Sequence, residues 1–162
     1  MPRKLPITPG SPQEWLLRAK SNLALAAQTR PEGALWEDQC FLAQQAAEKA
    51  LKAVYQHRGL MFEFIHDLKK LGKGLERDGL RVPSEVREVI ALTKYAFETR
   101  YPGPFEPVTE AEYKQALVLA EAVVDWADKI ISAPDKPSGG LGVQESHAVY
   151  KVGKYKAKSK RR

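Results

Sequence analysis

The sequence has a single cysteine, Cys40, among 162 residues. One thiol excludes an internal disulfide and a CxxC metal site, which fits a reducing compartment. No run approaches the roughly 20 apolar residues of a membrane-spanning helix. The start, MPRKLPITPGSP, lacks the apolar stretch of a signal peptide. We therefore expect a cytoplasmic protein without a membrane segment.

Three kinds of site-forming motif are also missing from the sequence. It has no glycine-rich phosphate loop, no spaced group of metal ligands and no nucleophile triad, and its histidines number three. These absences argue against dinucleotide enzymes, metalloenzymes and serine-type hydrolases. We expect the protein to need neither a metal nor a cofactor.

The net charge of +6 is concentrated at one end of the chain. Residues 133–162 hold eight basic and two acidic residues, whereas the remainder holds 18 of each. Proline, serine and glycine open this segment, so we expect a disordered basic tail over 133–162 and a flexible leader over 1–10. The tail suits salt-sensitive contact with nucleic-acid phosphates, or it only solubilises the protein. Its candidate binding residues are Lys154, Lys156, Lys158, Lys160, Arg161 and Arg162.

Five segments between these ends show helical periodicity. They run from Ser11 to about Gln28, over 35–58, from His66 to about Leu75, from Pro83 to about Ala96, and from Thr109 to Ile131. Short loops join them, and each has one apolar stripe, so they bury these stripes by packing together. The prediction is one all-α domain over 11–132, an up-down antiparallel helical bundle of about five helices.

Local signals mark several helix ends and one helix face. Ser11 with Glu14, and Thr109 with Glu112, have the spacing of a capping box, and Gly59 is placed to stop the second helix. Alanines on the second helix permit close approach of a neighbour, and we expect a homodimer. The fourth stripe is predicted to comprise Val86, Val89, Ile90, Leu92 and Ala96.

The segment CFLAQQAAEKALKA, residues 40–53, resembles the second-helix signature of HEPN domains, the higher-eukaryote and prokaryote nucleotide-binding family. His66-Asp67-Leu68, Tyr95, Thr99-Arg100-Tyr101-Pro102-Gly103 and a capped last helix follow in the family's order. The resemblance spans about Trp15 to Ile131. It implies a dimerising helical bundle that is commonly encoded beside a minimal nucleotidyltransferase as a toxin–antitoxin unit.

Many members of that family are ribonucleases whose site is an arginine followed, after four to six residues, by a histidine at the dimer cleft. The pairing is chemically sound because histidine transfers protons and arginine stabilises charge on phosphate. Arg100 is present here, but the histidine window holds Phe105, Glu106 and Pro107. The resemblance therefore implies a nucleotide- or RNA-associated protein with an incomplete ribonuclease motif.

Several roles stay open for the candidate residues. Arg100 and Tyr101 are the candidate nucleotide or RNA contacts, and Arg100 could instead cap the fourth helix. One alternative is an active, metal-independent endoribonuclease in which Glu106 or His66 replaces the missing histidine, although a structural role for His66 is favoured. Another alternative is a non-catalytic protein-interaction module.

The remaining conspicuous side chains have structural interpretations. Cys40 lies on an apolar stripe and is expected to be a small core residue without chemistry. Lys49 and Lys52, with Glu48, are interpreted as a solvated helix face. The tryptophans are expected to pack in the core or at the dimer interface; they are Trp15, Trp36 and Trp126.

Overall fold

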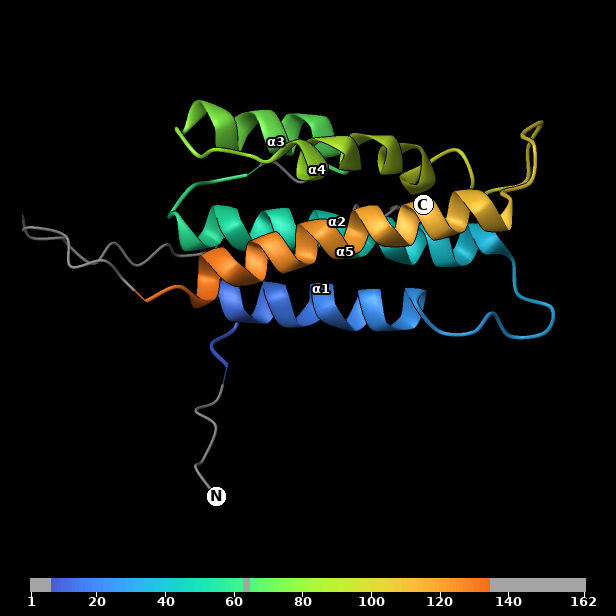
Figure 1. Cartoon of the computed structure of the whole chain (residues 1–162), viewed down its shortest axis with the longest axis horizontal. Coiled ribbons are helices and arrows are strands. Elements are labelled where there is room, and N and C mark those ends of the chain that lie inside the picture. The colour runs from blue at the N-terminus through green and yellow to red at the C-terminus, as the bar shows by residue number, and fades with distance from the viewer. Residues whose placement is uncertain (1–6, 63–64, 135–162) are drawn as a thin grey trace, which may run out of the picture.

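The computed structural model describes residues 7–62 and 65–134, so the tail residues proposed to bind nucleic acid lie outside the described part. This part contains helices and no strand (Figure 1). The predicted all-α bundle is confirmed. Its elements are α1 (Pro12–Ala26), α2 (Trp36–His57), α3 (Leu68–Arg77), α4 (Ser84–Arg87), the 3₁₀ helix η1 (Glu88–Ala96) and α5 (Glu110–Ser132).

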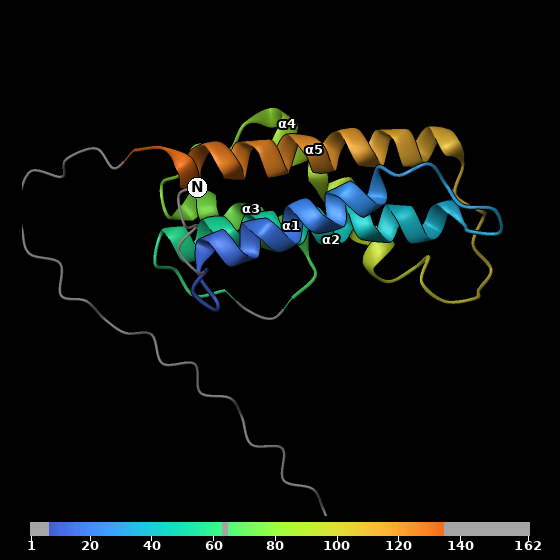
Figure 2. The ribbon, with the colours of Figure 1, turned by 90° about the horizontal axis from the view of Figure 1, so that it is seen from below.

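Helix α2 is the centre of the bundle. It packs against α1, α3, η1 and α5, whereas α1 packs mainly against α2 and α5. Figures 1 and 2 show α1 antiparallel to α2, and α5 running in the same direction as α2. Helix α3 also runs in the direction of α2 (Figure 1). The bundle therefore combines an antiparallel pair, α1 with α2, and parallel pairs, α2 with α3 and with α5.

The predicted capping signals form as local hydrogen bonds. Thr109 accepts a bond from the backbone N–H of Glu112, whose carboxylate accepts one from the N–H of Thr109, so this capping box is complete. At α1, Ser11 accepts from the N–H of Glu14, but Glu14 accepts from the N–H of Gly10 instead. Gly59 follows α2 with a φ of +68°, a conformation that favours glycine and ends the helix.

Alanine lets the helices approach α2 closely. Because alanine has the smallest side chain that still favours helix, a row of alanines keeps the helix stable while bringing neighbouring backbones near. Packing at interior density then leaves no space for a larger group. The alanines of α2 with no exposed surface are Ala43, Ala46, Ala47, Ala50 and Ala53.

The fourth predicted helix forms with a different period. It begins as one α-helical turn and continues as a nine-residue 3₁₀ helix, longer than most such helices. A 3₁₀ helix has three residues per turn, and the buried side chains recur at that spacing: Val86, Val89, Leu92 and Tyr95. Ile90, which we placed on the buried stripe, is 41% exposed. The prediction that Ile90 is buried is wrong because it assumed 3.6 residues per turn, whereas this helix has three residues per turn.

Enlarging one buried alanine is expected to destabilise the bundle. Ala47→Leu adds three carbons where none fit, and such overpacking costs about 1–3 kcal/mol. Ala24→Leu is the matched control, because Ala24 is exposed on α1. Urea unfolding followed by circular dichroism should show a lower midpoint for Ala47→Leu alone. Equal midpoints would contradict tight packing around α2.

Candidate nucleic-acid site

Arg100 lies in the exposed segment that follows η1. Its guanidinium carbon is 4.6 Å from the ring centroid of Phe41 on α2 and 5.6 Å from that of Tyr101. Stacking on rings fixes the planar guanidinium while leaving its N–H donors available. In the part of the chain that the structure describes, Arg100 makes no ion pair with a carboxylate. The guanidinium of Arg100 is thus fixed by the two rings and exposed to solvent.

The segment that holds Arg100 also carries several exposed aromatic side chains. Phe97, Tyr101 and Phe105 are all more than half exposed, and Tyr101 reaches 68%. Large apolar rings normally avoid this degree of exposure, and several together mark an interaction surface. Exposed rings beside a cation are the combination on which single-stranded nucleic acids stack.

His66 stands on a neighbouring part of this surface, in the connection before α3. Its Nδ1 lies 2.9 Å from Oε2 of Glu48 on α2, and its side chain is 47% exposed. Its ring meets Phe97 edge-on, with 5.8 Å between the ring centroids. The next residue, Asp67, caps α3 by accepting from the N–H groups of Lys69 and Lys70. The His66 ring is thus fixed by Glu48 and Phe97 on one side and exposed to solvent on the other.

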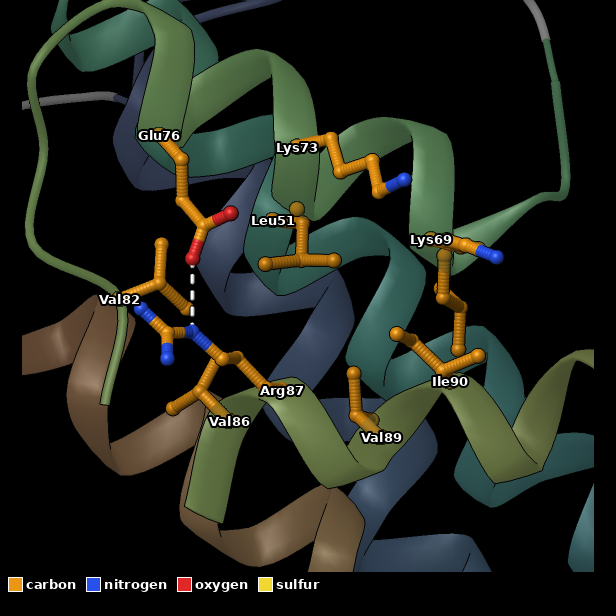
Figure 3. A pocket seen from close by; sticks show the side chains of 11 residues that line it. Leu51, Lys69, Lys73, Glu76, Val82, Val86, Arg87, Val89 and Ile90 are labelled. Atoms are coloured by element: carbon orange, nitrogen blue, oxygen red, sulfur yellow. Dashed lines mark hydrogen bonds and ion pairs between the residues drawn. The ribbon is translucent and has the colours of Figure 1, made fainter. Parts of the chain in front are cut away.

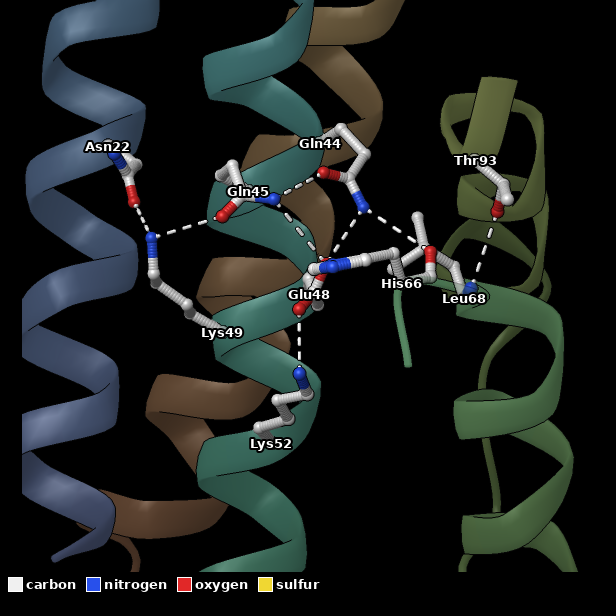
Figure 4. A network of polar contacts seen from close by, with 9 residues as sticks. All are labelled: Asn22, Gln44, Gln45, Glu48, Lys49, Lys52, His66, Leu68 and Thr93. Atoms are coloured by element: carbon white, nitrogen blue, oxygen red, sulfur yellow. Dashed lines mark hydrogen bonds and ion pairs between the residues drawn. The ribbon is translucent and has the colours of Figure 1, made fainter. Parts of the chain in front are cut away.

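The carboxylate that holds His66 is buried and saturated with donors (Figure 4). Glu48 is 4% exposed and accepts from Nζ of Lys52 at 2.6 Å and from Nε2 of Gln44 at 3.0 Å. Burial acts to raise the pKa of Glu48. The hydrogen bonds from Lys52, His66 and Gln44 outweigh burial, so the pKa lies below its usual value and the carboxylate stays charged at neutral pH.

Lys52 is also withdrawn from water, at 4% exposure. Besides Glu48, its ammonium group faces the rings of Phe62 at 5.3 Å and Trp15 at 5.9 Å. Lys49 donates to Asn22 of α1, and burial lowers its pKa. The interpretation of Glu48, Lys49 and Lys52 as a solvated face is therefore wrong, because α1 and the segment before α3 cover this side of α2.

Arg100 and His66 each contact a residue on the same side of α2. Phe41, which carries Arg100, and Glu48, which holds His66, are seven residues apart, or about two turns and 10 Å along one helix side. Phe97 touches His66 and precedes Arg100 by three residues, so the two groups are also connected through the segment after η1. The structure thus places two of the predicted site residues against the same side of α2, at positions two turns apart.

Other predicted residues are not part of this arrangement. Glu106 is exposed in the loop before α5, away from the contacts of Glu48 and His66. Cys40 is fully buried, and burial raises the pKa of its thiol to about 11, so at neutral pH it is not a thiolate. Trp15 and Trp36 pack against Phe62 and Tyr113, as the core interpretation requires.

A cavity of about 140 Å³ lies between α3 and the α4–η1 segment (Figure 3). Its floor is aliphatic, with Leu51, Val86 and Val89 among the lining residues. At its rim Arg87 is neutralised by Glu76 at 2.7 Å. It contains no histidine and no unpaired carboxylate, so it lacks the groups that acid–base chemistry needs.

Two further features are absent from residues 7–62 and 65–134. No three histidine, cysteine or acidic side chains come together there as metal ligands. No helix in these ranges combines the length and apolarity required to cross a membrane.

Comparison with known proteins links this structure to one family. A model of the HEPN domain matches residues 12–130. The crystal structure of TT1696 from Thermus thermophilus is 33% identical, with a TM-score of 0.65 over 74% of this chain and 98% of that one. The crystal structure of ST0689, an archaeal HEPN homologue, is 26% identical, with a TM-score of 0.60 over 75% and 98%. No curated protein matches the chain.

Sequence reasoning missed Glu48 and Gln44 as site residues. The signal was present as a polar row at four-residue spacing, Gln44, Glu48 and Lys52, within a helix whose other sides are rich in alanine. A polar row with small apolar residues on both sides is covered when other helices pack closely against those residues, and its members must then pair with one another.

Removing the buried carboxylate is expected to destabilise the protein in a pH-dependent way. Glu48→Gln leaves Lys52 buried without a counter-charge, a change that costs about 3 kcal/mol at pH 7. Folding lowers the pKa of Glu48. The stability that its charge contributes is therefore complete above the usual pKa of 4.5 and is lost as the pH falls through the lowered pKa. Urea unfolding at several pH values should show the two proteins converge in acid.

Glu32→Gln provides the control for general acid effects, since Glu32 is an exposed carboxylate in the loop between α1 and α2. The double variant Glu48→Gln, Lys52→Met should regain part of the loss, because it removes the unpaired ammonium group. A constant difference between Glu48→Gln and the wild type across the acid range would show that the charge on Glu48 is not responsible.

Proposed function

The chain belongs to the HEPN domain family, and we propose that within this family it binds single-stranded RNA or a nucleotide through Arg100. The proposal includes a homodimer that acts with a minimal nucleotidyltransferase as a two-gene, toxin–antitoxin unit. The ribonuclease motif of the family is incomplete in this sequence, so binding is the activity that its surviving member, Arg100, supports.

The exposed guanidinium of Arg100 is the observation that carries the proposal. Arg100 has no ion pair with a carboxylate among the described residues. Phosphate can therefore bind its guanidinium without first displacing such a partner. Its stacking on Phe41 and Tyr101 reduces the freedom that it would lose on binding. Arginine also matches phosphate better than lysine does, because its planar donors bind two oxygens at once.

The surrounding rings favour a single strand or a free nucleotide over a duplex. Bases in a duplex are already stacked on one another, whereas unpaired bases can stack on a protein ring. Tyr101 offers such a face beside Arg100, and Phe97 and Phe105 are exposed in the same segment of the chain. The same exposed rings are available for contact between two copies of the chain, which is the arrangement expected of a dimer with a shared cleft.

Replacing Arg100 is expected to weaken RNA binding. Arg100→Ala should reduce the affinity for a single-stranded oligoribonucleotide about tenfold or more, because a charged hydrogen bond contributes about 1.5–3 kcal/mol. It should also lower the salt dependence of binding by about one phosphate contact. Fluorescence anisotropy at several salt concentrations measures both effects.

The matched control is Arg81→Ala, which removes an exposed arginine between α3 and α4. Both variants keep the basic tail, so a difference between them reports on the helical domain. Arg100→Lys is expected to bind with intermediate affinity, because it keeps the charge and loses the planar fork. Equal affinities for Arg100→Ala and Arg81→Ala would refute a binding role for Arg100.

The partnership has its own test. A reading frame for a minimal nucleotidyltransferase is expected beside the gene, and the two products, expressed together, should co-elute in size-exclusion chromatography. The protein expressed alone should elute with the mass of a dimer. Absence of such a frame, or separate elution, would reject the two-gene unit without affecting the RNA-binding result.

A further inference from the structure

We infer that the cavity between α3 and the α4–η1 segment binds a free aliphatic carboxylate of about six carbon atoms. The chain of this ligand lies among the aliphatic side chains, and its carboxylate lies on Lys69 and Lys73. The inference goes beyond the proposed function and does not depend on it, because Arg100 is not among the residues that line the cavity.

The lining of the cavity suits a hydrocarbon chain. Leu51 of α2, Val86 of α4 and Val89 of η1 all line it, and each is at most 3% exposed. Ile90 also lines the cavity and is 41% exposed, so the apolar lining continues to the surface of the protein. An aliphatic lining offers no hydrogen bonds to water and therefore favours an apolar guest.

The size of the cavity limits the length of the chain. Its volume is about 140 Å³. An apolar cavity of about 150 Å³ accommodates benzene, so a chain of about six carbon atoms fits here. A long-chain fatty acid is too large for this space, whereas acetate leaves most of it unfilled.

Gly72 of α3 keeps one wall of the cavity open. At the other glycine of this helix, Gly74, an added Cβ would collide with the hydroxyl group of Tyr55, so packing requires a glycine there. An added Cβ at Gly72 would meet no atom of the described residues within 4 Å. Glycine is unfavourable inside a helix, and packing does not require it at Gly72. Its effect there is to leave space in the cavity wall.

The rim of the cavity carries two lysines that are unpaired in the described part of the chain. Lys69 and Lys73, one turn apart, lie on the side of α3 that lines the cavity, as Gly72 does. Glu76 on the same side does not compensate them, because it accepts from Arg87 at 2.7 Å. Figure 3 shows this ion pair at one end of the cavity and Lys69 at the other.

Lining and charge together select an anion with an apolar tail. A carboxylate accepts charge-assisted hydrogen bonds from ammonium groups and compensates their charge. An alcohol of the same length leaves both lysines uncompensated, and an alkylammonium ion adds a third positive charge beside them. Because the aliphatic lining and both lysines belong to one small cavity, a single small molecule reaches all of these groups.

The test titrates the full chain, labelled with ¹³C at its methyl groups, with hexanoate and follows the methyl signals by NMR. We expect saturable shifts at the lining residues Leu51, Val86, Val89 and Ile90. Butanoate should bind about 15-fold more weakly, because each buried methylene contributes about fourfold in affinity. Hexanol and hexylammonium should bind about tenfold more weakly or worse, because they lose the charge-assisted hydrogen bonds.

Two sets of variants locate the site. Lys69→Gln combined with Lys73→Gln should weaken hexanoate binding about tenfold and leave hexanol binding unchanged. Lys70→Gln combined with Arg77→Gln is the matched control, because both residues are exposed on α3 and neither lines the cavity. Gly72→Leu should fill the cavity and abolish hexanoate binding, with circular dichroism to show that the variant is folded.

The inference is overturned if hexanoate causes no saturable methyl shifts, if hexanol binds as tightly, or if the two double variants bind hexanoate equally. A capped leucine–glutamate dipeptide presents an aliphatic side chain and a carboxylate as a protein segment does. Tighter binding of this dipeptide than of hexanoate would overturn the free carboxylate in favour of a protein partner. If Gly72→Leu does not fold, the lysine variants and the comparison with butanoate still decide the question.

Discussion

The structure depends on a charged pair buried within an alanine-rich helix. Glu48 and Lys52 lie one turn apart on α2, and both are almost completely removed from water. Desolvating two charges is expensive, and it is tolerated here because every face of the pair has a partner: Gln44 and His66 on the carboxylate, and aromatic rings on the ammonium group. This requirement fixes the segment before α3 against α2.

The same pair connects stability to the surface that we assign to binding. His66 is held because Glu48 needs donors, so the arrangement of a half-exposed histidine follows from the requirements of the core. Arg100 is held differently, by stacking on Phe41 two turns earlier on the same helix. One rigid element thus sets the positions of both groups, and rigid elements position reactive side chains more accurately than loops do.

The sequence predicted the helices that have strong local signals. Thr109 with Glu112 and Gly59 after α2 each act within a few residues, so their effect does not depend on the rest of the fold. The 3₁₀ helix escaped prediction because its period is set by packing: α2, α3 and α5 cover a row spaced by three, which exposes Ile90. Glu48 and Lys52 were misjudged because a charge pair at four-residue spacing is usually solvated.

Local chemistry and the order of motifs along the chain were enough to predict an all-α bundle, its principal helices and the HEPN family, and to single out Arg100 as a candidate. Tertiary packing decided which polar residues are buried, which side of α2 faces His66 and Arg100, and that α2 and α5 run in the same direction. The physical reason is range: capping and helix periodicity act over a few residues, whereas burial depends on which distant segments cover a side chain.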